Sequence, residues 1–275
     1  MSAKNCVRLN SRASCEKQFC VKRKKVAAFS TVAPHGSERG FPWVAIGSPA
    51  ALGSNLADST SATSISLTTT QSAPAGSAII VIASEASLGT TPTSASCSDS
   101  AGNTYSTDVT EYYAGYAILT ICSAHAISAP LASGATITVT SVGAAGPQVL
   151  RIQAWSVTGL AALPLDQTAS AAAVSASPSS GAAATTAQST ELLFGAIVDS
   201  NQTVAGSGFT PGTNGTSNVC TTTRTPSYTN LGGIGSASGD SLFGMYCVVS
   251  STGAYAASAT ISAPYLWEAA LATYK

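Results

Sequence analysis

The run Ala135-Thr-Ile-Thr-Val-Thr140 alternates threonine with apolar residues, a period of two that is typical of a strand with one buried face. Similar short runs, rich in β-branched and aromatic residues, recur along the chain between clusters of Gly, Pro, Ser and Asn. They are 64–70, 78–84, 117–124, 149–157, 192–198, 242–250, 257–262 and 265–274. Short strands at this spacing, without helical patterns between them, predict an all-β sandwich or jelly roll.

Two stretches of the chain show these features in the same order. In each, a long apolar run is followed by two cysteines, an alternating run and a strand with one tryptophan, Trp155 or Trp267, which we expect to anchor the core. The predicted fold is a two-layer antiparallel β-sandwich, jelly-roll-like, with pseudo-repeated halves of about 44–160 and 161–275 in one domain. The Ala- and Ser-rich segment 168–187 can pair as a strand and crossing loop.

The composition excludes several classes of protein. Only 9% of the 275 residues are charged, 45% are hydrophobic and the formal net charge is zero. A disordered chain combines low hydrophobicity with a high net charge, and a membrane-spanning helix needs about 18 consecutive apolar residues. The alanines stand among Ser, Thr and Gly, which argues against a coiled coil. A sparsely charged β-protein of a particle or cell exterior remains.

The charge is unevenly distributed along the chain. Nine of the twelve basic residues lie within the first 39 positions, where only Glu16 and Glu38 oppose them, so this segment carries +7 and the rest of the chain −7. We call residues 1–43 the basic arm and expect it to be flexible or extended. Such an arm can bind nucleic acid or an acidic protein surface. A solvated tail, or residues translated upstream of the natural start, are the open alternatives.

Four of the seven cysteines lie beyond the arm, as pairs 25 and 27 residues apart: Cys97 with Cys122, and Cys220 with Cys247. They are candidate disulfides, which fit an oxidising location or assembly outside a cell. Four buried thiols are the equally open alternative. No Cys-x-x-Cys pair occurs and the chain has two histidines, so we expect no zinc site.

The clearest polar constellation is Asp108 and Glu111 beside Tyr112, Tyr113 and Tyr116. Aromatic rings and carboxylates on a loop can stack on a sugar and bind its hydroxyls, so these five residues are a candidate glycan-binding site. A polar hairpin tip followed by a tyrosine-bearing strand is the simpler alternative.

Other chemistry has less support in the sequence. His125 stands in an apolar context, Ile121-Cys-Ser-Ala-His-Ala-Ile127, which indicates a structural histidine rather than a member of a hydrolytic triad. Asp99 and Asn103 lack the further acidic ligands of a calcium loop. We therefore expect no catalytic residue, no metal and no cofactor, and the chain is not predicted to be an enzyme.

Residues 97–105, Cys-Ser-Asp-Ser-Ala-Gly-Asn-Thr-Tyr, predict two strands joined by a tight turn. This turn, the two-half layout and the final strand, Leu266-Trp-Glu-Ala-Ala-Leu-Ala-Thr-Tyr-Lys275, resemble those of Ala-, Ser-, Thr- and Gly-rich β-sandwich proteins of tailed bacteriophage virions and bacterial surfaces. The resemblance covers about 44–275 and leaves out the basic arm. It implies an exterior structural or adhesive role and transfers no catalytic residue.

These observations favour a structural protein of a phage-like particle: a capsid decoration, head-fibre or tail-associated protein. The alternatives are a carbohydrate-binding or adhesive module of a bacterial surface, and a jelly-roll coat protein whose basic arm binds nucleic acid. Strands of Thr, Ser and Ala lack the charges that prevent edge-to-edge pairing. We therefore expect a homo-oligomer that contacts other virion or surface proteins, has no membrane span, and is located in a virion or at an extracellular surface.

Overall fold

The computed structural model describes residues 45–59, 63–87, 93–113, 117–142, 148–200, 208–235 and 240–275. They belong to the second of two units, Val44–Lys275, the first being Met1–Trp43. The basic arm therefore lies outside the described residues. The described residues form antiparallel sheets and contain no helix, which confirms the predicted all-β sandwich class.

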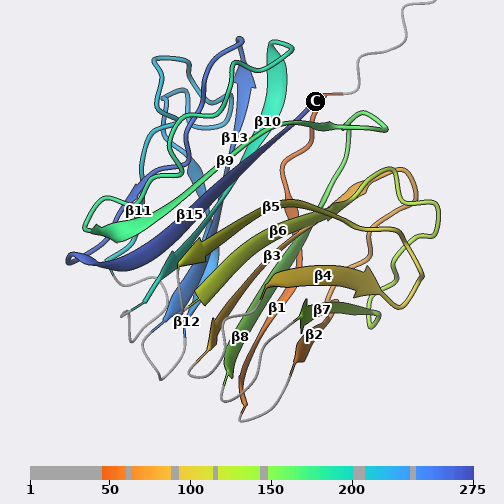
Figure 1. Cartoon of the computed structure of the whole chain (residues 1–275). Helices are drawn as coiled ribbons and strands as arrows, with labels where there is room; N and C mark the ends of the chain where they lie inside the picture. Colours follow the sequence, from red (N-terminus) through yellow and green to blue (C-terminus); the bar gives the residue numbers. More distant parts are fainter. Residues whose placement is uncertain are drawn as a thin grey trace, which may run out of the picture. The chain divides into compact units, whose positions relative to one another are not determined.

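Two five-stranded sheets form the centre of the molecule (Figure 1). In spatial order, the first central sheet consists of β1 (Ala50–Ser59), β8 (Gln148–Val157), β3 (Ala78–Ser87), β6 (Ala117–Ala124) and β5 (Ser106–Tyr113). The second central sheet consists of β12 (Thr229–Gly235), β13 (Ser241–Ser250), β10 (Thr190–Asp199), β15 (Tyr265–Tyr274) and β9 (Leu165–Ser175).

Two smaller sheets lie outside this pair. A three-stranded sheet of β2 (Ser64–Thr68), β7 (Thr136–Val142) and β4 (Ser94–Asp99) shares a buried cluster with one face of the first central sheet. The short strands β11 (Thr210–Pro211) and β14 (Ala259–Thr260), with the loops around them, do the same for the second. Each central sheet is therefore covered on both faces.

The two central sheets face each other across a shared cluster of buried side chains, which we call the inter-half core. It consists of Ile80, Ile82, Leu119, Ile121, Trp155 and Val157 from the first sheet, and Leu192, Phe194, Ala196, Val198, Leu242, Tyr246, Val248, Ala270, Ala272 and Tyr274 from the second. The rings of Trp155 and Phe194 meet there, with centroids 5.3 Å apart. This core makes one packed body of the two halves.

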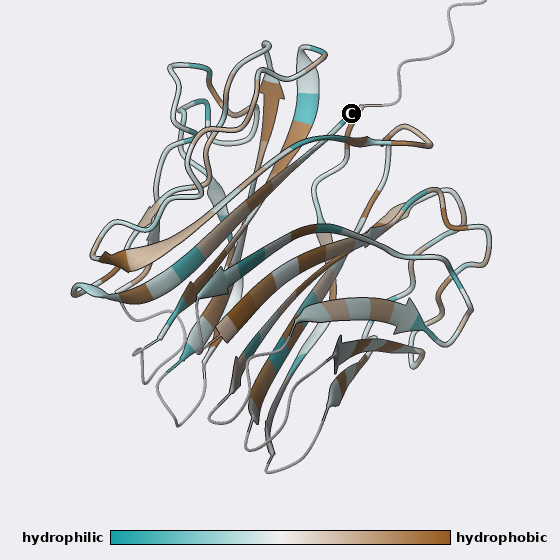
Figure 2. Ribbon diagram, in the orientation of Figure 1, coloured by the Kyte–Doolittle hydropathy of each residue, from teal (hydrophilic) through white to brown (hydrophobic). Residues whose placement is uncertain are grey.

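Burial on both faces explains why the central strands are nearly continuously apolar (Figure 2). All eight residues of β6 are buried, whereas β2 alternates exposed and buried residues because its outer face meets solvent. The alternating run 135–140 lies in β7 of the same outer sheet. Period two thus marks the outer layer, and continuous apolar runs mark the central one.

The predicted strands are found with few exceptions. The run 257–262 shortens to β14, and the Ala- and Ser-rich segment contributes the long strand β9. Strands β1 and β12 are not among the predicted runs, because Gly, Asn and Ser dilute their pattern. Both predicted core anchors are buried, Trp155 in the inter-half core and Trp267 on the outer side of the second central sheet.

The strand orders of the two central sheets match. Reading β5-β6-β3-β8-β1 beside β12-β13-β10-β15-β9 gives every strand of the first half one counterpart in the second. Each half also has one disulfide at a corresponding strand: Cys97–Cys122 joins β4 to β6, and Cys220–Cys247 joins the loop before β12 to β13. This match of strand orders establishes neither the jelly-roll topology nor the internal repeat, which stay predictions.

The turn after β4 is organised by one side chain, as its sequence predicts. Asp99 accepts hydrogen bonds from the backbone amides of Ala101 and Asn103, at 2.9 and 3.1 Å, and from the Tyr105 hydroxyl at 3.1 Å. Gly102 supplies the positive φ, +78°. Because the Asp99 carboxylate accepts hydrogen bonds from the backbone that follows it, this is an Asx-type turn.

Candidate functional site

The candidate glycan residues Asp108, Glu111, Tyr112 and Tyr113 all lie on β5, the edge strand of the first central sheet, and Tyr116 lies outside the described residues. Tyr112 is 42% exposed, and its hydroxyl donates to the carbonyl of Thr93. Tyr113 follows it directly, so the two rings point to opposite faces of the strand. The structure does not bring these two rings onto one surface.

Asp108 is turned inward by a β-bulge. Strand β5 pairs with β6 through Thr107 and Val109, and Asp108 is the extra residue between them. Its Oδ2 accepts a hydrogen bond from the buried Ser123 hydroxyl of β6 and one of 2.6 Å from the Tyr274 hydroxyl of β15. Since β15 belongs to the second half, the bulge connects the two halves through a carboxylate.

His125 completes this cluster, which we call the Asp108 network. Its Nε2 lies 3.0 Å from the Ser123 hydroxyl oxygen. Because the Ser123 proton is donated to Asp108, the His125 Nε2–H donates to Ser123. The serine thus lies between the histidine and the carboxylate, whereas a hydrolytic triad needs the histidine between the other two. The Ser123 side chain is also fully buried.

The charges of the Asp108 network follow from its burial. Burial raises the pKa of Asp108, while hydrogen bonds from Ser123 and Tyr274 and the nearby His125 oppose the rise. Burial lowers the pKa of His125, and Asp108 opposes this. A neutral His125 with its proton on Nε2 is consistent with both directions. The arrangement holds strands together and presents no accessible nucleophile.

A second polar cluster crosses the inter-half core. The buried guanidinium of Arg151 on β8 lies 3.4 Å from the Asp240 carboxylate at the start of β13. Burial raises the pKa of Glu268 on β15 to about 8, Glu111 and Asp240 add to the rise, and the Tyr113 backbone amide opposes it. Glu111 therefore lies near the charges of this cluster rather than with the tyrosine rings.

Arg151, Asp240 and Glu268 are not among the residues predicted to have a role. A signal was present for two of them: Arg151 stands within Val149-Leu-Arg-Ile152, and Glu268 within Leu266-Trp-Glu-Ala269, both otherwise apolar strands. A charge in such a run requires a buried partner. Which strand supplies the partner is a tertiary fact.

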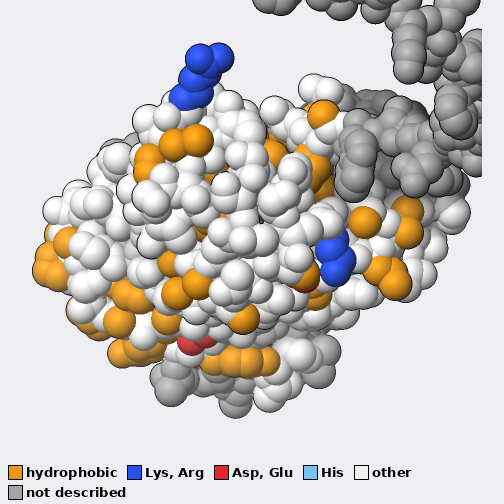
Figure 3. All heavy atoms as spheres, turned by 90° about the horizontal axis from the view of Figure 1, so that it is seen from above, with side chains coloured by type: hydrophobic (Ala, Val, Ile, Leu, Met, Phe, Trp, Pro, Cys, Tyr) orange, Lys and Arg blue, Asp and Glu red, His pale blue; other side chains and the backbone are white. Residues whose placement is uncertain are grey.

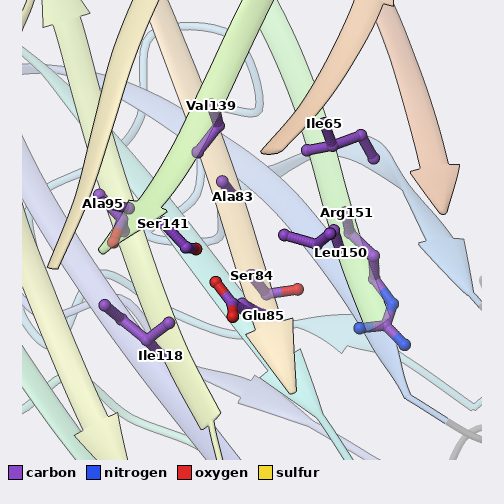
Figure 4. A pocket seen from close by; sticks show the side chains of 11 residues that line it. Ile65, Ala83, Ser84, Glu85, Ala95, Ile118, Val139, Ser141, Leu150 and Arg151 are labelled. Carbon is purple, nitrogen blue, oxygen red and sulfur yellow. The ribbon is translucent and has the colours of Figure 1, made fainter. Parts of the chain in front are cut away.

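A small cavity lies between the first central sheet and the outer sheet, and Figure 4 shows its lining. It has a volume of about 10 Å³, room for about one water molecule. Glu85 lines it, and burial raises the pKa of that carboxyl to about 7. Arg151 lines it too, but its guanidinium points away from Glu85 (Figure 4). A cavity of this size holds no organic substrate.

The acidic groups lie inside the body. Among the carboxylates whose side chains the structure describes, none is exposed: Glu85, Glu191, Asp199, Asp240 and Glu268 are buried, and Asp99, Asp108, Glu111 and Asp166 are half-buried. Arg224 is exposed, and Lys275 lies 3.5 Å from Asp166. The face in Figure 3 shows little acidic surface. Nine of the ten carboxylates beyond the arm are therefore buried or half-buried.

The described residues contain no metal site, and the comparisons with known proteins point to none. In the described ranges, no three His, Cys, Asp or Glu side chains group closely enough to hold a metal ion. The same residues contain no helix long and apolar enough to cross a membrane. No family model matches the chain, and no curated protein or solved structure matches it.

Proposed function

We propose that the protein is a non-enzymatic structural component of a phage-like particle, on its exterior, as a capsid decoration, head-fibre or tail-associated protein. The observation that carries the proposal is the placement of the acidic side chains, which are buried or half-buried rather than exposed. The carboxylates that the structure describes are buried or half-buried, and several of them connect strands or halves, while the described surface carries few exposed charges.

A sparsely charged surface suits dense packing of copies. Proteins with exposed charge of one sign repel each other, and this keeps them apart in solution. Here the outer strands β2 and β7 and the edge strand β9 of the second central sheet are rich in Thr, Ser and Ala, which make contacts without opposed charges. The exposed Leu163 and Val219 add apolar contact points. Neighbouring proteins on a lattice could therefore approach closely.

The two disulfides fit a location outside the reducing cytosol. Each joins a central strand to an outer element, so it holds two layers together. By closing loops of this length, each is expected to stabilise the folded state by about 3.5 kcal/mol. Such covalent ties suit a protein that must persist on an exposed particle.

Immunogold electron microscopy of particles from the source culture tests the proposal. An antibody against the purified protein should label intact particles at regular positions, and mass spectrometry of gradient-purified particles should contain the chain. Labelling confined to cells, with the chain missing from purified particles, would contradict it. An antibody against a cytosolic protein of the same culture is the matched control for contamination.

A further inference from the structure

The edge strand β9 differs from the other three edges of the central sheets. All four edge strands pair with their neighbour through one irregularity near their start. Beyond it, β1 and β5 carry the charged residues Asp58 and Glu111, and β12 continues for only a few residues, with two adjacent glycines. Residues 168–175 run in unbroken register with β15.

This part of β9, Thr168-Ala-Ser-Ala-Ala-Ala-Val-Ser175, contains no charge, proline or glycine. Charges and prolines are devices that protect an edge, and glycine weakens a strand. Val174 is 60% exposed. Strand β5 packs close to β9 without pairing with it, and apart from β15 no described residue pairs with the backbone of this segment. Its outward backbone groups therefore remain available to an incoming strand.

We propose that β9 of one copy pairs antiparallel with β9 of a second copy, joining their second central sheets into one ten-stranded sheet. The inference rests on the proposed function, since it names the contact through which copies associate. The lack of charge at this edge indicates which partner it binds. An uncharged edge on a surface without exposed described carboxylates offers no counter-charge to a basic or acidic partner. A second copy presents the same uncharged edge.

Symmetry defines the register of this contact. A two-fold axis perpendicular to the sheet places residues of the same face opposite each other, so the axis passes midway between the two copies of one residue. Centred on Ala171, it pairs Ser170 with Ala172, Ala169 with Ala173, and Thr168 with Val174. All these side chains are small or β-branched and uncharged, so the pleated ladder closes without like charges opposed.

The double substitution Thr168→Lys with Val174→Lys tests the contact. Both side chains are exposed, and in the paired register lysines of the two copies lie opposite each other at both ends. Light scattering across a concentration series should give a dimer mass for the wild type. The variant should dimerise at least about tenfold more weakly than the wild type, with an unchanged Tm. The double substitution Ser217→Lys with Val219→Lys, at exposed loop positions, adds the same charge and should leave the dimer intact.

Hydrogen exchange of the β9 amides locates the contact. Exchange in 168–175 should slow as the wild-type concentration rises, and should stay fast in the Thr168→Lys, Val174→Lys variant. A wild type that remains monomeric at every concentration overturns the proposal. Slow exchange in such a monomer means that the chain covers its own edge. A dimer that ignores both lysines associates elsewhere. Particles that contain the chain while the purified protein is monomeric would reject this contact and leave the proposed function standing.

Discussion

Corresponding bulges in the two halves are filled by different chemistry. In the first half, the bulge in β5 places Asp108 against Ser123 and Tyr274. In the second half, the bulge in β12 places Leu231 against the inter-half core. Both bulges lie beside a strand that carries a disulfide cysteine, β6 or β13. Two sheets with the same strand order can thus have either a hydrogen-bonded carboxylate or a leucine at corresponding bulges.

The corresponding strands β8 and β15 also carry different residues at equivalent positions. Val81 pairs with both Cys122 and Ala154, and Leu193 with both Cys247 and Thr273, so Ala154 corresponds to Thr273. Counting back three residues, the buried Arg151 corresponds to Ala270. The first half thus contributes the cation, and the second contributes its partner Asp240 together with Glu268, which lies near Asp240.

Removing the cation should have the largest effect. Arg151→Met leaves Asp240 buried without its guanidinium, and breaking a buried pair costs about 3–5 kcal/mol. Urea unfolding should show this loss in the free energy of unfolding. Arg151→Met combined with Asp240→Asn removes both charges and should recover most of it. If the double variant is no more stable than the single one, charge at this contact is not the cause.

Removing the disulfides compares the halves directly. The loops closed by Cys97–Cys122 and Cys220–Cys247 have separations of 25 and 27 residues, so chain entropy predicts an equal cost of about 3.5 kcal/mol for each. Calorimetry of Cys97→Ala with Cys122→Ala, and of Cys220→Ala with Cys247→Ala, measures both. Losses that differ by more than about 1 kcal/mol would mean that native packing around the two bridges, and not loop length, dominates.

The Asp108 network should be worth more than its apolar counterpart. Tyr274→Phe removes one hydrogen bond to a carboxylate, at a cost of about 1.5–3 kcal/mol. Leu231→Ala removes a partly buried side chain and should cost about 1 kcal/mol. A double-mutant cycle of Tyr274→Phe with Asp108→Asn should show coupling of about 1 kcal/mol or more. Additive losses would show that the two side chains act independently.

The last prediction concerns pH, and its effect is spread over several pH units. The pKa values of Glu85 and Glu191 are raised to about 7, and that of Glu268 to about 8, in each case chiefly by burial. Between about pH 4.5 and these values the folded chain binds more protons than the unfolded chain, so these groups make stability fall as pH rises. Each contributes at most about 1.4 kcal/mol per pH unit.

Glu268→Gln should therefore flatten the decline of Tm between about pH 5 and pH 8. Glu85→Gln, in the first half, is the matched variant, and its effect should end about one pH unit lower. Identical pH profiles for wild type and Glu268→Gln would show that Glu268 does not titrate in the folded protein over this range.

Local patterns predicted the strands that have a strong signal. Alternation identified β7, continuous apolar runs identified β3, β6, β10 and β13, and Asp99 with Gly102 identified the turn after β4. These depend on neighbours in sequence. The two tryptophans lie on corresponding strands but not at corresponding positions, since Trp155 corresponds in register to Tyr274. Only cross-strand pairing reveals that.

The predicted grouping on β5 depends on geometry that the sequence does not encode locally. A one-residue bulge turns Asp108 toward Tyr274, a residue 166 positions away, and so removes it from the surface where Tyr112 is exposed. Glu111 lies near Glu268 for the same kind of reason. Side-chain direction in a strand changes with each residue of register, so spacing alone could not place these groups.

Periodicity, composition and spacing were enough to predict an all-β chain with short or buried strands, and the four cysteines that could form bridges within the body. The burial of the carboxylates, and which strand lies at an unpaired edge, follow only from the folded arrangement. Burial and pairing are set by segments far apart in the chain, and charge is tolerated inside only where such a segment brings a hydrogen bond or a counter-charge.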